Sequence, residues 1–160
     1  PSAVSDFYDD LLISDIYEAE IKELVQSATG ADQVHIFDHT RRAATDNLRK
    51  AVKSREPASV IHNDYTDFSA PQRLRVLLPD QAKTRLQNRF AIVNVWRSIF
   101  GTVETFPMAF CDSTSVDTDD LVAVKRLSND RIGEIQYALH NPMHRWFYFP
   151  AMKMLSLIHI

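Results

Sequence analysis

The spacing of hydrophobic and polar positions predicts a helical start followed by many short strands. Between residues 6 and 29 the apolar side chains recur at helical intervals, and Gly30 stands where a C-terminal cap is expected. Residues 71–78 and 80–86 indicate two short helices. Runs rich in β-forming residues, bounded by turn residues, favour strands at 34–37, 58–61, 89–99, 107–110, 121–127, 134–139 and 145–149. This order predicts an α+β, mainly β fold: a jelly-roll domain with an N-terminal helix and short flanking helices.

The composition excludes several classes of partner. The chain has 160 residues, of which 45% are hydrophobic, enough for one domain with a core. The formal net charge of −3 provides no basic field for nucleic acid or an acidic membrane surface. No apolar run approaches the roughly 20 residues that cross a bilayer. The single cysteine, Cys111, allows no disulfide within the chain, so a reducing, cytoplasmic location is expected.

The two ends of the chain bear on its domain organisation. The chain starts at Pro1 without a methionine, and the next residues lack the features of a secretory signal. Residues 155–160 read Leu-Ser-Leu-Ile-His-Ile, which is the translation of a common sequencing adapter. We therefore interpret 155–160 as an adapter artefact and 1–154 as a single domain truncated at its C-terminus. The alternative is a natural apolar strand. On the first interpretation His159 is not a metal ligand.

A candidate metal site follows the expected strand 58–61. His62 and Asp64 are separated by one residue, and side chains two apart on a strand point to the same face. An imidazole and a carboxylate on one face, joined by a second histidine from a distant strand, form the facial triad of Fe(II) oxygenases. The spacing is short enough to occur by chance. A strand-end histidine beside an aspartate that caps the next turn therefore stays open as an alternative.

Other polar residues are weaker candidates. Asn94 and Arg97 interrupt an apolar strand, and Asn94 shares one face with Trp96. We take these three residues, together with Tyr65, as candidates for a substrate or co-substrate pocket; the alternative for Asn94 and Arg97 is a purely structural role. A rival metal pair, His35 and His39, lacks a nearby carboxylate on its face.

Four aspartates and an aromatic run complete the candidates. The aspartates are spaced somewhat like a calcium loop, but the glycine and the final glutamate of such a loop are missing, so turn and cap roles are expected for Asp112, Asp117, Asp119 and Asp120. The run from His144 to Phe149 predicts an aromatic strand that contributes to core and sheet surface.

Six segments, in this order, resemble the CmcJ/NvfI-type oxidoreductase family, which includes AsaB-like hydroxylase/desaturases and cephalosporin 7-methoxylation proteins. The resemblance runs from about residue 1 to residue 154. The segments are FDHTRR (37–42), HNDYT (62–66), PQRL (71–74), RFAIVNVWR (89–97), AFCDS (109–113) and HRWFYFP (144–150).

The resemblance implies an Fe(II)/2-oxoglutarate-dependent oxygenase of secondary metabolism, built on a double-stranded β-helix. It implies hydroxylation or desaturation of a small, natural-product-like substrate. His62 and Asp64 match the family's ligand pair. The family's distal histidine, and the arginine expected to hold 2-oxoglutarate, lie beyond the residues present here, so the β-helix is expected to be incomplete. We expect this chain to bind Fe(II) weakly and to turn over nothing. The sequence does not indicate an oligomeric state or the substrate.

Two other functions compete with this interpretation. Some relatives carry a methyltransferase label, but a Rossmann-type cofactor site needs a glycine-rich loop, and Gly30, Gly101 and Gly133 are widely spaced. A non-catalytic, cupin-like binding module would use the same jelly roll without redox chemistry. His62 and Asp64 favour the enzyme.

Overall fold

The computed structural model describes residues 2–128, 131–153 and 157–159. The chain divides into two compact units. Unit 1 comprises Pro1–Pro57, Val93–Pro107 and Pro150–Ile160, and unit 2 comprises Ala58–Ile92 and Met108–Phe149. Each unit is therefore built from segments that lie far apart in the sequence.

The predicted N-terminal helix of unit 1 is confirmed. It consists of α1 (Asp10–Leu12), a π-helical turn η1 (Ile13–Tyr17) and α2 (Glu18–Thr29). It begins four residues later than expected, because the carboxylate of Asp9 accepts hydrogen bonds from the first free amides of α1. It ends where expected, because Gly30 adopts the left-handed conformation with φ of 70°.

The hydrophobic core of unit 1 is built partly from this helix. Val4, Phe7 and Ile13 are buried together. The partly buried hydrophobic side chains packed against them are those of Leu12, Ile16, Tyr17 and Ile99. The helix therefore buries one apolar face, as its periodicity predicts.

The rest of unit 1 has little regular structure. The basic segment 39–55 contains the short helix α3 (Asp46–Val52), which Thr45 caps. The prediction of a strand at 34–37 is wrong: this β-rich run has no strand assigned, because strand formation depends on a partner and not on propensity alone.

One strand pair belongs to unit 1. Strand β2 (Val95–Arg97) pairs antiparallel with β7 (Leu157–His159), with Trp96 opposite Ile158. The predicted strand 89–99 is thus reduced to three residues. Of the tail 155–160, residues 155, 156 and 160 lie outside the described residues. The adapter interpretation of the tail stays a prediction.

Unit 2 contains a three-stranded antiparallel sheet in the order β1-β5-β4. Strands β4 (Leu121–Ser128) and β5 (Arg131–Ala138) form a hairpin, in which Leu121 lies opposite Ala138. Strand β1 (His62–Asn63) pairs with the other edge of β5. The predicted strand 58–61 is wrong, because pairing starts only at His62, and the predicted strand 134–139 begins earlier, at Arg131.

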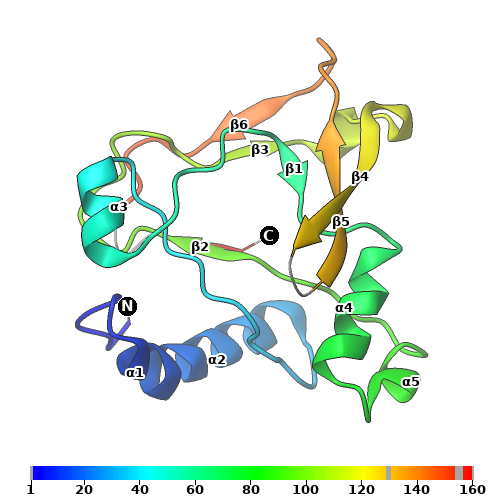
Figure 1. Cartoon of the computed structure of the whole chain (residues 1–160), viewed down its shortest axis with the longest axis horizontal. Helices are drawn as coiled ribbons and strands as arrows, with labels where there is room; N and C mark the ends of the chain where they lie inside the picture. The colour runs from blue at the N-terminus through cyan, green and yellow to red at the C-terminus, as the bar shows by residue number, and fades with distance from the viewer. Residues whose placement is uncertain (1, 129–130, 154–156, 160) are drawn as a thin grey trace. The chain divides into compact units, whose positions relative to one another are not determined.

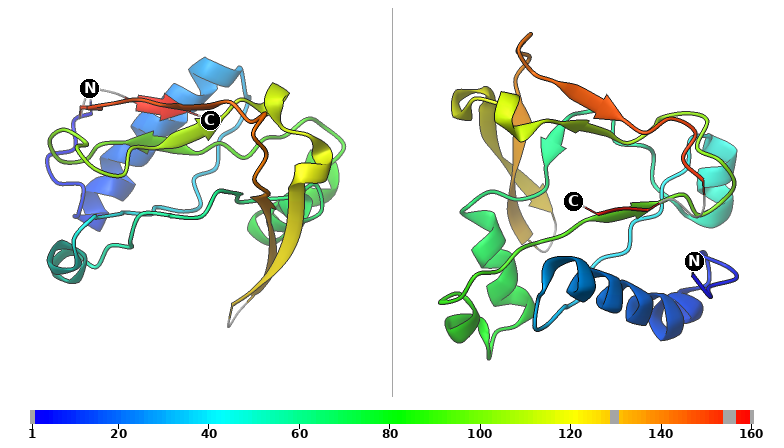
Figure 2. Two further views of the ribbon diagram at one scale, coloured as in Figure 1. Left: turned by 90° about the horizontal axis from the view of Figure 1, so that it is seen from above. Right: turned by 180° about the vertical axis from the view of Figure 1, so that it is seen from behind.

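A second strand pair and two helices complete unit 2. Strands β3 (Ala109–Cys111) and β6 (Trp146–Tyr148) form an antiparallel ribbon (Figures 1 and 2). The two predicted helices are confirmed as α4 (Ser69–Leu77) and α5 (Ala82–Arg85). Two short 3-10 turns, η2 (Ser113–Ser115) and η3 (Thr118–Asp120), lead into β4.

The described strands are exclusively antiparallel, which confirms short helices combined with antiparallel sheets. They are shorter than expected, and in the described residues they form separate sheets instead of a closed barrel. Among these residues, none of the helices has the length and apolar character that crossing a lipid bilayer requires.

Candidate functional site

His62 and Asp64 come together as the spacing predicts. His62 belongs to β1, and Asp64 follows at a bend directly after this strand. The Nε2 atom of His62 lies 3.4 Å from Oδ1 of Asp64. The two side chains are 25% and 47% exposed, respectively, so both are partly open to solvent. An imidazole nitrogen and a carboxylate oxygen therefore converge at an accessible position.

The other ring nitrogen of His62 determines which atom is available to a metal. Nδ1 lies 2.7 Å from the backbone carbonyl of Val60. A carbonyl only accepts hydrogen bonds, so Nδ1 carries the proton and donates it. In the neutral ring the lone pair then lies on Nε2, the atom that faces Asp64. Metal-binding histidines are commonly oriented by such a bond to a carbonyl.

The two donors fit one first-row metal ion. Such ions lie about 2.0–2.2 Å from nitrogen and oxygen ligands. Two ligands of one ion can therefore be up to about 4 Å apart, and the 3.4 Å between Nε2 and Oδ1 falls within this limit. The described residues contain no group of three histidine, cysteine or acidic side chains placed to hold a metal. Within this part of the chain the site thus offers two ligands.

Strand β5 holds the His62 segment from one side. His62 pairs with Tyr137 and Asn63 with Gln136 across the ladder. The side-chain amide of Asn63 donates to Oε1 of Gln136 at 3.4 Å, and the rings of His62 and Tyr137 meet edge to face at 6.5 Å. Pairing with strand β5 therefore fixes the backbone of His62 and Asn63, directly before Asp64.

Just after Asp64, a polar cluster holds the chain to β5 again. The hydroxyl of Thr66 donates to Oε1 of Glu134 at 2.6 Å, and that of Ser69 donates to the backbone carbonyl of Glu134 at 2.7 Å. The amide of Thr66 donates to the Ser69 hydroxyl, and the amide of Ser69 to the Thr66 hydroxyl. This exchange closes the turn that begins α4.

The predicted pocket residues fall into both units. Tyr65 lies beside Asp64 in unit 2, whereas Asn94, Trp96 and Arg97 belong to unit 1. The guanidinium of Arg97 lies 4.5 Å from the ring centroid of Phe7 and 5.7 Å from that of Tyr17. Arg97 thus packs on the aromatic core of unit 1. The pocket role of these four residues stays a prediction.

The rival pair His35 and His39 does not lie on a strand. His39 instead pairs with Glu18 of α2, its Nε2 lying 3.2 Å from Oε1. A hollow of about 320 Å³ adjoins this pair, and another of about 520 Å³ lies between α4 and α5. Neither hollow is lined by His62 or Asp64.

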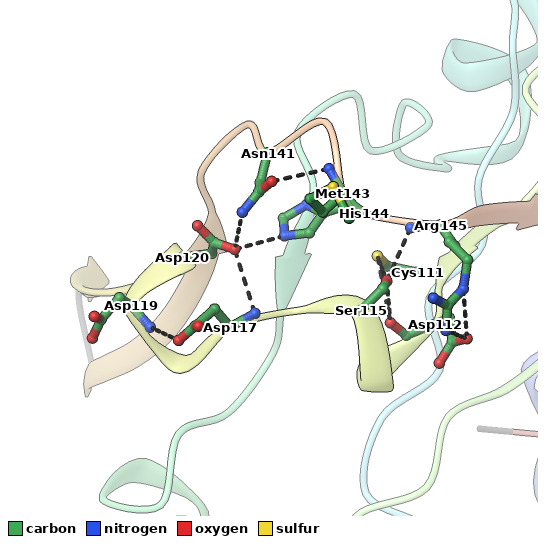
Figure 3. A network of polar contacts seen from close by, with 10 residues as sticks. All are labelled: Cys111, Asp112, Ser115, Asp117, Asp119, Asp120, Asn141, Met143, His144 and Arg145. Carbon is green, nitrogen blue, oxygen red and sulfur yellow. Dashed lines mark hydrogen bonds and ion pairs between the residues drawn. The ribbon is translucent and has the colours of Figure 1, made fainter.

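The aspartates after β3 have the expected turn and cap roles (Figure 3). Asp112 caps η2 and Asp117 caps η3. Hydrogen bonds from the Arg145 guanidinium, and then from Thr114, lower the pKa of Asp112 from 3.8 to about 2. These bonds join η2 to the start of β6.

A buried histidine organises the neighbouring turn. The side chain of His144 is 2% exposed, and its Nε2 lies 2.9 Å from Oδ2 of Asp120 (Figure 3). The amide of Asn141 donates to the same oxygen at 2.9 Å. Hydrogen bonds from Asn141 and His144 lower the pKa of Asp120. The aspartate therefore links the turn before β4 to the turn before β6.

Sequence reasoning missed the carbonyl of Val60 and the residues of the Glu134 cluster. Thr66 shortly precedes a predicted helix, and threonine is a preferred residue at helix starts, so Thr66 could have been singled out as a candidate cap. No local signal marks Glu134, because it lies 68 residues from Thr66.

The whole chain, residues 1–160, matches a family model described as oxidoreductase/YMDC permease-like domain. It is 28% identical to the alpha-ketoglutarate-dependent dioxygenase phiK of Fungal sp., over 98% of this chain and 59% of phiK. It is 30% identical to the hydroxylase/desaturase CTB9 of Cercospora beticola, over 94% of this chain and 53% of CTB9. The chain thus spans little more than half the length of these relatives.

A solved structure shares the fold of the chain. The iron and alpha-ketoglutarate-dependent endoperoxidase NvfI matches with a TM-score of 0.83 and 27% identity, over 94% of this chain and 55% of NvfI. Together these matches confirm the resemblance to CmcJ/NvfI-type oxidoreductases.

Proposed function

This chain belongs to the oxidoreductase/YMDC permease-like domain family, and from that premise we propose that it carries the iron-binding segment of an Fe(II)/2-oxoglutarate-dependent oxygenase. The observation that carries the proposal is the convergence of His62 Nε2 and Asp64 Oδ1 at 3.4 Å. The names of phiK and NvfI support it, since each states dependence on alpha-ketoglutarate. The substrate class we propose is a small natural product, and the reaction hydroxylation or desaturation.

The residues of this chain would act by holding and orienting the metal. His62 would bind through Nε2, since Nδ1 donates to the Val60 carbonyl, and Asp64 would bind through its carboxylate. When bound, iron with 2-oxoglutarate and O₂ supplies the oxidising chemistry that attacks an unactivated C–H bond. One negative ligand and one neutral ligand leave other positions on the ion open for the co-substrate.

We further propose that the separate sheets are parts of a jelly roll that the remainder of a full-length oxygenase completes. Strand β6 supports this, because Trp146, Phe147 and Tyr148 are all exposed although they point to alternate faces. A two-stranded ribbon with two apolar faces is marginally stable in water. The relatives have a further two-fifths to one half of their length with which to cover such a surface.

Metal binding by the 160-residue chain tests the ligand pair. We expect anaerobic titration with Fe(II), or with Co(II) as a spectroscopic substitute, to shift the backbone amide NMR signals of Asn63 and Tyr65, which flank the ligand pair and are present in every variant. His62→Ala and Asp64→Ala should abolish the shift. His140→Ala is the matched control, because His140 is an exposed histidine of the same unit. Equal binding by all four proteins would refute the assignment.

Turnover tests the rest of the proposal. We expect no succinate formation from 2-oxoglutarate by the 160-residue chain, and iron-dependent succinate formation once the chain is extended to the length of its relatives. An extended protein that binds iron but leaves 2-oxoglutarate intact would favour the cupin-like binding module. Resequencing the transcript across residues 155–160 would test the adapter interpretation of the tail.

A further inference from the structure

The cluster around Glu134 is unusual for its burial. Among the described residues, the polar residues that are buried as a whole are Thr66, Ser69 and Ser98, which are 8%, 7% and 5% exposed. Two of these three belong to one cluster, directly after the proposed iron ligands. Burying a hydroxyl is costly unless it is hydrogen-bonded, so a buried polar cluster needs a complete set of partners.

The cluster satisfies each of its hydroxyls. Thr66 uses its one hydroxyl proton on the Glu134 carboxylate, and Ser69 uses its proton on the Glu134 backbone carbonyl. Their oxygens accept the backbone amides of Ser69 and Thr66, respectively. Removing one member therefore leaves a buried donor or acceptor unpaired, which destabilises this arrangement in particular.

The position of the cluster relates it to the metal ligands. Asn63 is held to β5 by its pairing with Gln136, and Thr66 is held to the same strand by Glu134. Three residues extend to about 10 Å at most, so anchors at both ends restrict the path of Asp64 and Tyr65 between them. Burial alone does not hold the Asp64 side chain, which is 47% exposed. The path of the backbone on either side of Asp64 therefore contributes to the direction of its side chain.

We propose that Thr66, Ser69 and Glu134 are positioning residues that aim the Asp64 carboxylate at the metal held by His62. This inference rests on the proposed iron site. The cluster and the β1–β5 ladder together hold the ligand segment on strand β5, and supporting shells of this kind set the geometry of a metal site. A role confined to starting α4 would instead affect folding and leave metal affinity unchanged.

The test compares metal affinity with stability in the same proteins. Co(II) alone is titrated into the folded 160-residue chain under NMR observation of the His62 ring, at a temperature well below the midpoint of unfolding. Thr66→Val keeps the side-chain shape but removes the hydroxyl, and Glu134→Ala removes the acceptor. Glu134→Gln keeps an oxygen that can accept from Thr66. Ser98→Ala is the matched control, because its hydroxyl donates to Gly101 in the other unit.

We expect Thr66→Val and Glu134→Ala to weaken Co(II) binding about 10-fold, the lower end for loss of an outer-shell partner. Glu134→Gln should restore affinity to within about threefold of the original. Ser98→Ala should lower the unfolding temperature without changing the Kd. If the unsubstituted chain binds Co(II) and Thr66→Val binds it equally well, the positioning role is wrong while the ligand pair stands. If the unsubstituted chain does not bind Co(II), the ligand pair itself fails.

Discussion

The stacking of Arg97 on Phe7 leads to a prediction that separates a structural role for Arg97 from a role in a co-substrate pocket. Phe7 is buried, its ring meets Tyr17 edge to face at 5.2 Å, and the Arg97 guanidinium lies 4.5 Å from its centroid. Replacing Phe7 by leucine keeps an apolar side chain but removes both ring interactions. Replacing Arg97 by methionine keeps an unbranched apolar chain but removes the charge.

The magnitude follows from the two contacts. An edge-to-face aromatic pair contributes about 1 kcal/mol beyond its burial. A partly desolvated cation–π contact contributes about 1 kcal/mol. Phe7→Leu should therefore lower the free energy of unfolding by about 2 kcal/mol, and Arg97→Met by about 1 kcal/mol. The double variant should show a coupling energy of about 1 kcal/mol, because the cation–π contact is lost only once.

Urea unfolding measures these differences. With a slope of about 2 kcal/mol per molar urea, Phe7→Leu should lower the midpoint by about 1 M. Trp96 lies in unit 1 and Trp146 in unit 2, so a Trp146→Phe background restricts the fluorescence signal to unit 1. A coupling energy below about 0.3 kcal/mol would lie within ordinary additivity, and would refute a structural contact between Arg97 and Phe7.

Three further predictions concern single residues. The pKa of Asp112 is about 2, against its ordinary 3.8. Its contribution to stability is therefore present above pH 3.8 and is lost as the pH falls through about 2. In ¹³C NMR of the carboxyl group, the Asp112 of the Arg145→Met variant should titrate closer to 3.8. Burial raises the pKa of the Tyr17 hydroxyl above 10.0, although Arg97 opposes the shift. The unfolded chain therefore loses this proton first, and the free energy of unfolding should fall as the pH rises past 10. In unfolding curves, Tyr17→Phe should remove the part of this fall that Tyr17 causes. Gly30→Ala should lower the free energy of unfolding by about 1 kcal/mol because of the positive φ alone. Gly133→Ala should change it far less, because the φ of Gly133 is ordinary and an added Cβ would lie 3.8 Å from its nearest neighbour, the carbonyl oxygen of Arg126. Equal losses in thermal unfolding would contradict this reasoning.

Elements that depend on local pattern were predicted well. The amphipathic helix ending at Gly30 was predicted because its apolar spacing and its cap are properties of neighbouring residues. The two helices before β2 were found for the same reason, although α4 begins two residues early, at Ser69, whose backbone amide donates to the Thr66 hydroxyl. The β-rich run at 34–37 was misjudged, since a strand exists only where another segment pairs with it.

The sequence by itself determined that His62 and Asp64 share a side of one short segment, because alternation along an extended backbone is set by bond geometry. It also determined the family, through six short motifs in a specific order. Only the tertiary structure decided which nitrogen of His62 faces Asp64, and that Glu134 holds the chain just beyond it. These features depend on hydrogen bonds formed after folding, some between residues far apart in the chain, and no local pattern of residues encodes which distant group will satisfy a buried donor.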